Sequence, residues 1–342
     1  LVEKTKSVDL TQGSIPRHVG RMLGPFSIAV LALLSAGIVD TIYLGRIGVE
    51  ALAAIGFCAP LTFMGNSANI GLGAGTMSAV SRAIGQGDHE KAQRHGAAAI
   101  LLALSVMSVL AVFGLLAMSP VLSAMGAVPE VKALALTDLA WSLPGLVIIS
   151  VAMMSNNILR AGGEAMLPSA IMISGAVVNI VLDPFLIFGI GPFPRMEVEG
   201  AAIATLVGNV VGACFGFYIV LVHRRAISFA QMTFASMRRA WAIVGSVGMP
   251  AAATNIIVPV ATAGATAIIA LNMGTLEVAA FTVVSRAEIF SVGLIFALSA
   301  CIGAITGQNG GAGRTDRVRQ TFKVCYWIAF SWAGLMAIVL FL

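Results

Sequence analysis

Two aspartates lie inside strongly apolar segments of the sequence. Asp40 comes 18 residues after Met22 in a segment at about 22–44, and Asp183 comes 18 residues after Ala165 in another at about 165–190. A carboxylate inside a membrane is costly and usually has a function. If both segments are helices that run outward, a rise of about 1.5 Å per residue places the two aspartates at one depth, in the outer half of the membrane.

Neutral oxygen donors accompany these aspartates. Asn179 lies one helical turn before Asp183 and shares its face of the helix. Pro184 follows directly, removes one backbone hydrogen bond and favours a kink that exposes a carbonyl. Thr205, with Ala201 one turn before it, lies early in the next apolar segment and therefore at a similar depth.

Carboxylate, amide, hydroxyl and carbonyl oxygens are the ligands of hard cations. Two carboxylates that lie close together in a low dielectric cannot both be ionised at low cost unless a proton or a metal cation joins them. We therefore predict a proton- or Na⁺-binding site that contains Asp40, Asn179, Asp183 and Thr205. The alternative is that both aspartates lie at the outer interface and contact water.

The composition is that of an integral membrane protein. Only 10% of the residues are charged, 58% are hydrophobic, and the mean hydropathy is +0.97. Alternating ten-residue segments, which are typical of membrane β-barrels, are absent from the sequence. The apolar runs approach the length that crosses a hydrocarbon core as a helix. They predict an all-α, polytopic protein with nine spans, at about 22–44, 51–80, 96–118, 131–158, 165–190, 199–222, 240–271, 278–306 and 322–342.

Basic residues alternate between the two sides of these spans. Sixteen of the 20 Lys and Arg residues fall on one side, Arg46, Lys132 and Arg195 fall on the other, and Arg286 falls inside a span. The positive-inside rule places the N-terminus in the cytoplasm. The predicted parts are a cytoplasmic tail at 1–21, a six-span N-lobe at 22–222, a cytoplasmic inter-lobe loop at 223–239 and a partial C-lobe of about three spans at 240–342.

A weak internal repeat supports this division. The loop that starts at Gly85 resembles the loop that starts at Gly311, at an offset of 226 residues, and the same offset pairs Gly48 with Gly274. Six spans per repeat predict two parallel lobes about an axis along the membrane normal. A complete second lobe would need about three more spans. Since the chain starts without Met and ends inside an apolar run, we expect it to be a C-terminally truncated fragment.

The other polar residues within the spans give weaker signals. Arg286 and Glu288 are two residues apart and point to different faces of a helix, so a second polar site and a structural role are equally open. Asp138 lies near the end of a span and is expected to contact water. Gly71 and Gly75 form a GxxxG pattern, which favours close helix packing.

Several function classes lack their motifs. The sequence has no GxxxxGK[ST], CxxC or HExxH pattern and no recognisable Ser/His/Asp arrangement, so neither an enzyme nor a bound cofactor other than a coupling ion is expected. The four cysteines lack metal-ligand spacing. The basic residues lie in the short loops between spans, where topology explains them and nucleic acid is not needed.

The chain resembles the multidrug and toxic compound extrusion (MATE) family, and within it the DinF-like branch. The resemblance covers about residues 17–342 and rests on five segments: Val39-Asp40-Thr41, the loop from Ile84 to Asp88, Leu159 to Glu164, Asn179 to Pro184, and Gly200 to Thr205. It implies twelve spans in two six-helix lobes around a central cavity, of which about nine are present. It also implies a cation site at Asp40, Asn179, Asp183, Thr205 and the carbonyl of Ala201.

By this resemblance the protein is a secondary active transporter of the plasma membrane, a multi-pass antiporter that exports amphiphilic, often cationic compounds against H⁺ or Na⁺. It is expected to act as a monomer among membrane lipids. A lipid-linked oligosaccharide flippase of the same superfamily is the nearest alternative, but it would need a more cationic cavity, and Arg286 is the one basic residue in the middle of a predicted span. A non-transporting remnant is a further alternative.

Overall fold

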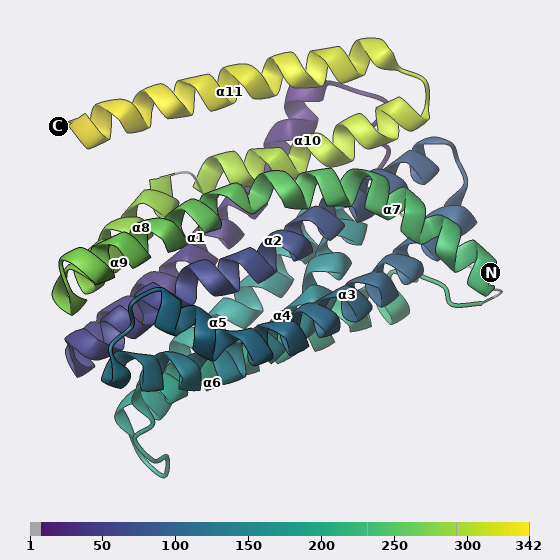
Figure 1. Cartoon of the computed structure of the whole chain (residues 1–342). Helices are drawn as coiled ribbons and strands as arrows, with labels where there is room; N and C mark the ends of the chain where they lie inside the picture. Colours follow the sequence, from purple (N-terminus) through teal and green to yellow (C-terminus); the bar gives the residue numbers. More distant parts are fainter. Residues whose placement is uncertain (1–7, 231, 292, 342) are drawn as a thin grey trace.

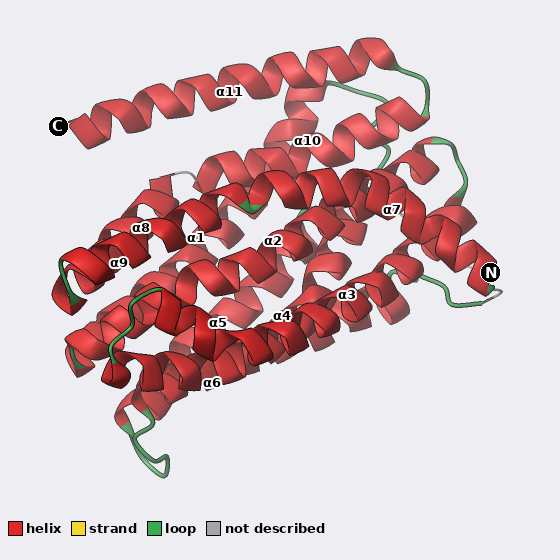
Figure 2. Cartoon of the chain, viewed as in Figure 1, coloured by secondary structure: helices red, strands yellow, loops and turns green. Residues whose placement is uncertain are grey.

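The computed structural model describes residues 8–230, 232–291 and 293–341, which form a bundle of α-helices joined by short loops (Figures 1 and 2). No strand occurs in this part of the chain, so the predicted all-α class is confirmed. The helices are α1 (Ile15–Ile47), α2 (Val49–Gly85), α3 (His89–Ala124), α4 (Pro129–Ala161), α5 (Met166–Phe188), α6 (Glu197–Tyr218) with a π-helical turn η1 (Ile219–His223), α7 (Phe234–Asn255), α8 (Ile257–Asn272), α9 (Thr275–Ser291), α10 (Gly293–Gly311) and α11 (Thr315–Phe341).

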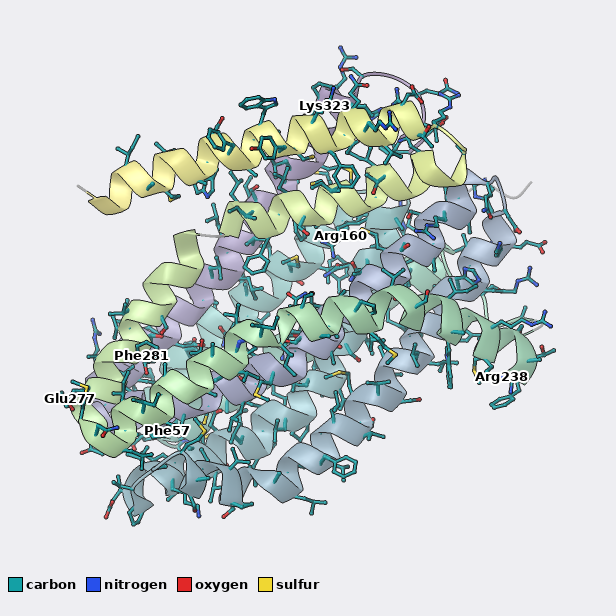
Figure 3. The ribbon with its side chains drawn as sticks, turned by 45° about the horizontal axis from the view of Figure 1, so that its top comes forward. Phe57, Arg160, Arg238, Glu277, Phe281 and Lys323 are labelled. Atoms are coloured by element: carbon teal, nitrogen blue, oxygen red, sulfur yellow. The ribbon has the colours of Figure 1, made fainter. Side chains whose placement is uncertain are left out.

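Nine segments of the described chain are long and apolar enough to cross a bilayer, which is the predicted number. The predicted seventh span consists of α7 and α8, which meet at Ile256, and the predicted eighth span corresponds to α9 and α10. Figure 3 shows Arg238 of α7 and Glu277 of α9 at opposite ends of the bundle, so α7 and α8 together cross its full thickness.

The helix bounds reproduce the sequence repeat. Shifting α2 by 226 residues gives 275–311, which is the combined range of α9 and α10. The same shift places the start of α3 at Thr315, the first residue of α11. The turns after these helices also match, because Gly87 and Gly313 have φ angles of 78° and 74°, a left-handed conformation that favours glycine.

Contacts between the two halves are reciprocal. A Cβ atom on Gly85 would overlap the backbone carbonyl of Gln308, and a Cβ on Gly311 would overlap the carbonyl of Arg82. Gly85 and Gly311 are repeat equivalents, and so are Arg82 and Gln308. Such an exchange of partners is what a two-fold axis produces among residues close to it. The ends of α2 and α10 therefore lie near a pseudo-two-fold axis.

The GxxxG pattern of α2 packs against α7, as predicted. A Cβ on Gly71 would overlap the carbonyl oxygen of Gly248, and a Cβ on Gly75 would overlap that of Val244. Glycines let two helix backbones approach closely, which strengthens van der Waals packing inside a membrane. This seam joins the first half of the chain to the second.

The segment before α1 ties the halves together at one end of the bundle. Leu10 is 1% exposed, its N–H donates to Gln308 Oε1 at 3.0 Å, and its carbonyl accepts from Asn309 and Arg317. Gln308 also donates to the carbonyl of Ala161 at the end of α4. We call this end, where α2, α4 and α10 finish and α1, α3, α7 and α11 begin, the basic end of the bundle.

The α2–α7 seam yields a first prediction. Gly75→Ala should lower the free energy of unfolding by about 1–3 kcal/mol, because the added methyl group forces the backbone of α7 away from α2. The measurement is thermal unfolding in detergent. Gly245→Ala is the matched control in α7, since a Cβ at Gly245 meets nothing within 4 Å. Equal melting temperatures for the two variants would show that the seam does not depend on this close approach.

Candidate cation-binding site

The structure brings four of the predicted site residues together in the half of the bundle away from the basic end. Asp40 lies in the last two turns of α1, Asn179 and Asp183 lie in α5, and Thr205 lies in α6. Helix α5 packs against both α1 and α6, so the three helices surround these side chains. Ala201 is buried one turn before Thr205 in α6.

Asn179 is the centre of the hydrogen-bond network. Its Nδ2 donates to Asp183 Oδ1 at 3.2 Å and to Thr205 Oγ1 at 3.2 Å. Asn179 is 6% exposed and Asp183 is fully buried, whereas Thr205 is exposed on one side. The amide therefore connects a carboxyl group with no access to water to a hydroxyl at the edge of the cluster.

The carboxyl groups of Asp183 and Asp40 also lie close enough to each other for a hydrogen bond between them. An ionised carboxylate only accepts hydrogen bonds, so two carboxyl groups form such a bond only when one of them carries a proton. Asp183 Oδ2 is buried and has no amide or hydroxyl donor among the described residues. A proton or another cation between its oxygens would therefore stabilise the pair. The alternative that both aspartates simply contact water does not fit the burial of Asp183.

Glycines explain why α5 and α6 come close enough to form this network. A Cβ on Gly208 of α6 would lie 2.6 Å from the carbonyl oxygen of Gly175, and a Cβ on Gly200 would lie 2.6 Å from that of Leu186. These two contacts flank the Asn179–Thr205 hydrogen bond. Close approach on both sides lets two short side chains meet across the helix interface.

Pro184 adds a second local feature. It lies inside α5 without ending the helix, which continues to Phe188. Because proline has no N–H, the carbonyl of Ile180 loses its helical partner. That freed oxygen lies one turn before Pro184, next to the Asn179 position, and adds to the oxygen-rich character of the cluster.

The prediction for Asp138 was wrong. This residue is 6% exposed, accepts a hydrogen bond from Ser142 at 3.2 Å, and lies beside Cys58 of α2. The sequence gives its distance from the end of the span but not which neighbour it faces. This turn of α4 packs against α2, since Cys58 Sγ also contacts the carbonyl of Ala135 at 3.4 Å. Asp138 is therefore a buried, hydrogen-bonded residue.

The second polar site predicted at Arg286 and Glu288 lies outside the described side chains, and it stays a prediction. In the part of the chain that the structure describes, no three His, Cys, Asp or Glu side chains cluster.

Arg160 lies inside the bundle, although in the sequence it comes just after the end of a predicted span. It belongs to the last turn of α4, and Figure 3 shows it in the interior of the bundle near α10. Its guanidinium donates to the carbonyl of Asn156 and to Asn157 Oδ1, and it lies 4.5 Å from the ring centre of Phe26 in α1. No carboxylate within 4.0 Å of it is found among the described residues. A basic group thus lies where α1, α4 and α10 meet.

Several known proteins are similar to this chain. A "FAD transporter" of Shewanella oneidensis is 34% identical over 312 residues, which cover 90% of this chain and 69% of that protein. A "Probable multidrug resistance protein YoeA" of Bacillus subtilis is 24% identical over 99% of the chain and 75% of its own length.

Solved structures match the fold closely. A "MOP superfamily transporter from Pyrococcus furiosus" superposes with a TM-score of 0.86 at 28% identity, over 99% of this chain and 75% of that one. The "Vibrio cholerae MATE transporter VcmN in the bent form" gives a TM-score of 0.81 at 28% identity, over 95% of this chain and 73% of its own.

The family model MatE matches residues 25–185 and 250–342, which include Asp40, Asn179 and Asp183 and parts of both repeats. Together with the all-helical bundle, the polar cluster between α1, α5 and α6, and the relatives above, this match establishes that the chain belongs to the MatE family of multi-pass membrane transporters.

Proposed function

We propose that this protein is an ion-coupled exporter in which a proton or Na⁺ binds at the cluster of Asp40, Asn179, Asp183 and Thr205. The observation that carries the proposal is the fully buried Asp183, bonded to both Asn179 and Asp40. A carboxyl pair in such a place has a high free energy when both groups are ionised, so it takes up a cation. Amphiphilic organic compounds are the first substrate class that we infer.

Coupling follows from the position of the cluster between helices. A bound cation stabilises the arrangement in which Asp40 of α1 lies against Asp183 of α5. When the cation leaves, repulsion between the carboxylates favours a state in which α1 has moved. Transport then requires only that the ion and the exported compound stabilise different states of the protein.

We further propose that the protein acts in the plasma membrane with its basic end towards the cytoplasm. The proposal rests on the positive-inside rule and on the clustering of basic residues around the α2–α3 and α10–α11 connections. The cation site then lies in the outer half of the membrane, so ions can reach it from outside.

Flavin adenine dinucleotide is a second candidate substrate. A transporter of this compound is 34% identical to the chain. Arg160 supports this candidate, because a guanidinium binds phosphate oxygens in a bidentate manner, and Arg160 lies inside the bundle without a carboxylate within 4.0 Å among the described residues. A positive charge in the transport pathway would disfavour cationic drugs and favour a dianionic pyrophosphate.

The ion-coupling proposal predicts that Asp40→Asn lowers gradient-driven transport by roughly 10- to 100-fold, since one charge-assisted interaction is worth about 1.5–3 kcal/mol. The measurement is uptake of ethidium or FAD into proteoliposomes under an imposed proton or Na⁺ gradient. Glu50→Gln is the charge-matched control, because Glu50 is exposed in the first turn of α2. Unchanged transport by Asp40→Asn protein that inserts normally would contradict the mechanism.

The substrate proposal predicts different effects of Arg160→Gln on the two compounds. FAD transport should fall by about tenfold or more, because a charge-assisted hydrogen bond to phosphate is lost, whereas ethidium transport should not fall. Arg319→Gln, which removes an exposed charge from α11, should affect neither compound. Transport of ethidium with no transport of FAD by the parent protein would leave amphiphilic cations as the substrates.

A further inference from the structure

A groove of about 320 Å³ lies between α3 and α7 at the basic end of the bundle. Its polar rim carries Lys91, Arg94 and His95 from α3 and Arg239 from α7. The two helices belong to different halves of the chain. The groove is separate from the cation-binding site, which lies between α1, α5 and α6 towards the other end.

The basic groups of the rim have no acidic partners. Lys91 donates to Gln86 Oε1 at 3.3 Å, a neutral group. No carboxylate lies within 4.0 Å of Lys91, Arg94 or Arg239 among the described residues. Three positive charges thus line one groove without an ion-pair partner within 4.0 Å, with Asp88 as a carboxylate of the same turn bonded to the backbone N–H of Lys91. This concentration of charge favours an anion.

His95 provides an independent indication of a ligand. The residue is 8% exposed and lines the groove, and its Nδ1 has no hydrogen-bond partner among the described residues. A buried polar atom without a partner costs free energy, so such atoms are usually satisfied by water or a ligand. An imidazole Nδ1 donates or accepts according to its protonation, which suits a phosphate oxygen or a headgroup hydroxyl.

Apart from Thr233 and Ser236, the rest of the groove lining is apolar. Ala98 and Ile243 are among its apolar lining residues, and Ile243 is 42% exposed. Trp241 Nε1 donates to the carbonyl of Ala98 at 2.9 Å and so holds α7 against α3 in this region. The groove therefore combines basic side chains with apolar ones, and Ile243 among the latter is exposed.

We propose that this groove binds an anionic phospholipid of the leaflet at the basic end, with its phosphate at Lys91, Arg94, His95 and Arg239 and an acyl chain along Ile243. Basic pockets between transmembrane helices on the cytoplasmic side are suited to acidic lipid headgroups. A free phosphate would use the rim alone, whereas a phospholipid uses both parts. Because the lipid contacts α3 and α7 together, it also stabilises the junction between the two halves.

The test measures lipid binding to the purified full chain in detergent by native mass spectrometry and by thermal shift. Phosphatidylglycerol should form a retained one-to-one adduct and raise the melting temperature. Phosphatidylcholine and inorganic phosphate at the same concentration should do neither. If inorganic phosphate stabilises the protein as well as phosphatidylglycerol does, the groove is a site for free anions and the lipid proposal is overturned.

A matched pair of variants locates the site. The triple variant Lys91→Gln/Arg94→Gln/Arg239→Gln should bind phosphatidylglycerol roughly 100-fold more weakly, at about fivefold per basic residue. The control Arg238→Gln/Arg319→Gln/Lys323→Gln removes the same charge from exposed positions outside the groove, and Figure 3 shows Arg238 and Lys323 on separate helices. If the two triple variants weaken phosphatidylglycerol binding equally, the binding depends on total surface charge and not on the groove, and the proposal is overturned.

Two single variants keep the test decisive if the groove triple variant does not fold. Arg239 is exposed, so Arg239→Gln should fold normally and weaken phosphatidylglycerol binding about fivefold. Ile243→Ser should weaken phosphatidylglycerol binding without creating any binding of inorganic phosphate. If both variants bind phosphatidylglycerol as the parent protein does, the lipid lies elsewhere.

Discussion

Close contact between helix backbones is the interaction on which the rest of this structure depends. Inside a bilayer the hydrophobic effect does not drive helices together, so van der Waals contact at small residues and a few polar bonds must do so. Helix α2 presents Gly71 and Gly75 to α7, and its C-terminal Gly85 contacts α10. The same device, at Gly175 and Gly208, brings α5 to α6 and allows Asn179 to reach Thr205. The polar cluster exists because glycine removes the side chains that would keep its helices apart.

The two ends of the bundle use polar groups in different ways. At the basic end, the segment around Leu10 is held by Gln308, Asn309 and Arg317 from the second half and contacts Gly162 after α4 through Val8. Any motion that separates the halves at this end must break several of these hydrogen bonds together. Towards the other end, the contact of α1 with α5 includes the carboxyl pair of Asp40 and Asp183, whose stability depends on a bound cation in the mechanism that we propose. The contact around Leu10 is made by hydrogen-bonding groups of the chain itself. The contact between Asp40 and Asp183 is proposed to change with the ion that it binds.

The sequence predicted which side chains come together where this depends only on their depth in the membrane and on the helix face that they occupy. Asp40, Asn179 and Asp183 could be grouped because the number of residues along each helix gives depth, and a spacing of four gives a shared face. Asp138 and Arg160 could not be placed in this way. Distance from the end of a span does not tell which neighbouring helix a side chain faces, and this depends on helix rotation and tilt. Asp138 faces α2, and Arg160 faces the junction with α1 and α10.

Arg160 is the residue at which the two candidate substrate classes differ. If the proposed transport pathway passes Arg160, a cationic amphiphile there would meet a positive charge with no carboxylate within 4.0 Å among the described residues, and in a low dielectric such a charge raises the free energy of the cation substantially. A dinucleotide would gain at the same point, because its pyrophosphate would replace the neutral amide and carbonyl partners of the guanidinium with charged ones. In the proposed mechanism the carboxyl cluster would not discriminate between these substrates, since its own cation would neutralise it. We therefore propose that selectivity for substrate charge and coupling to the ion reside in different residues, at different depths of the same bundle.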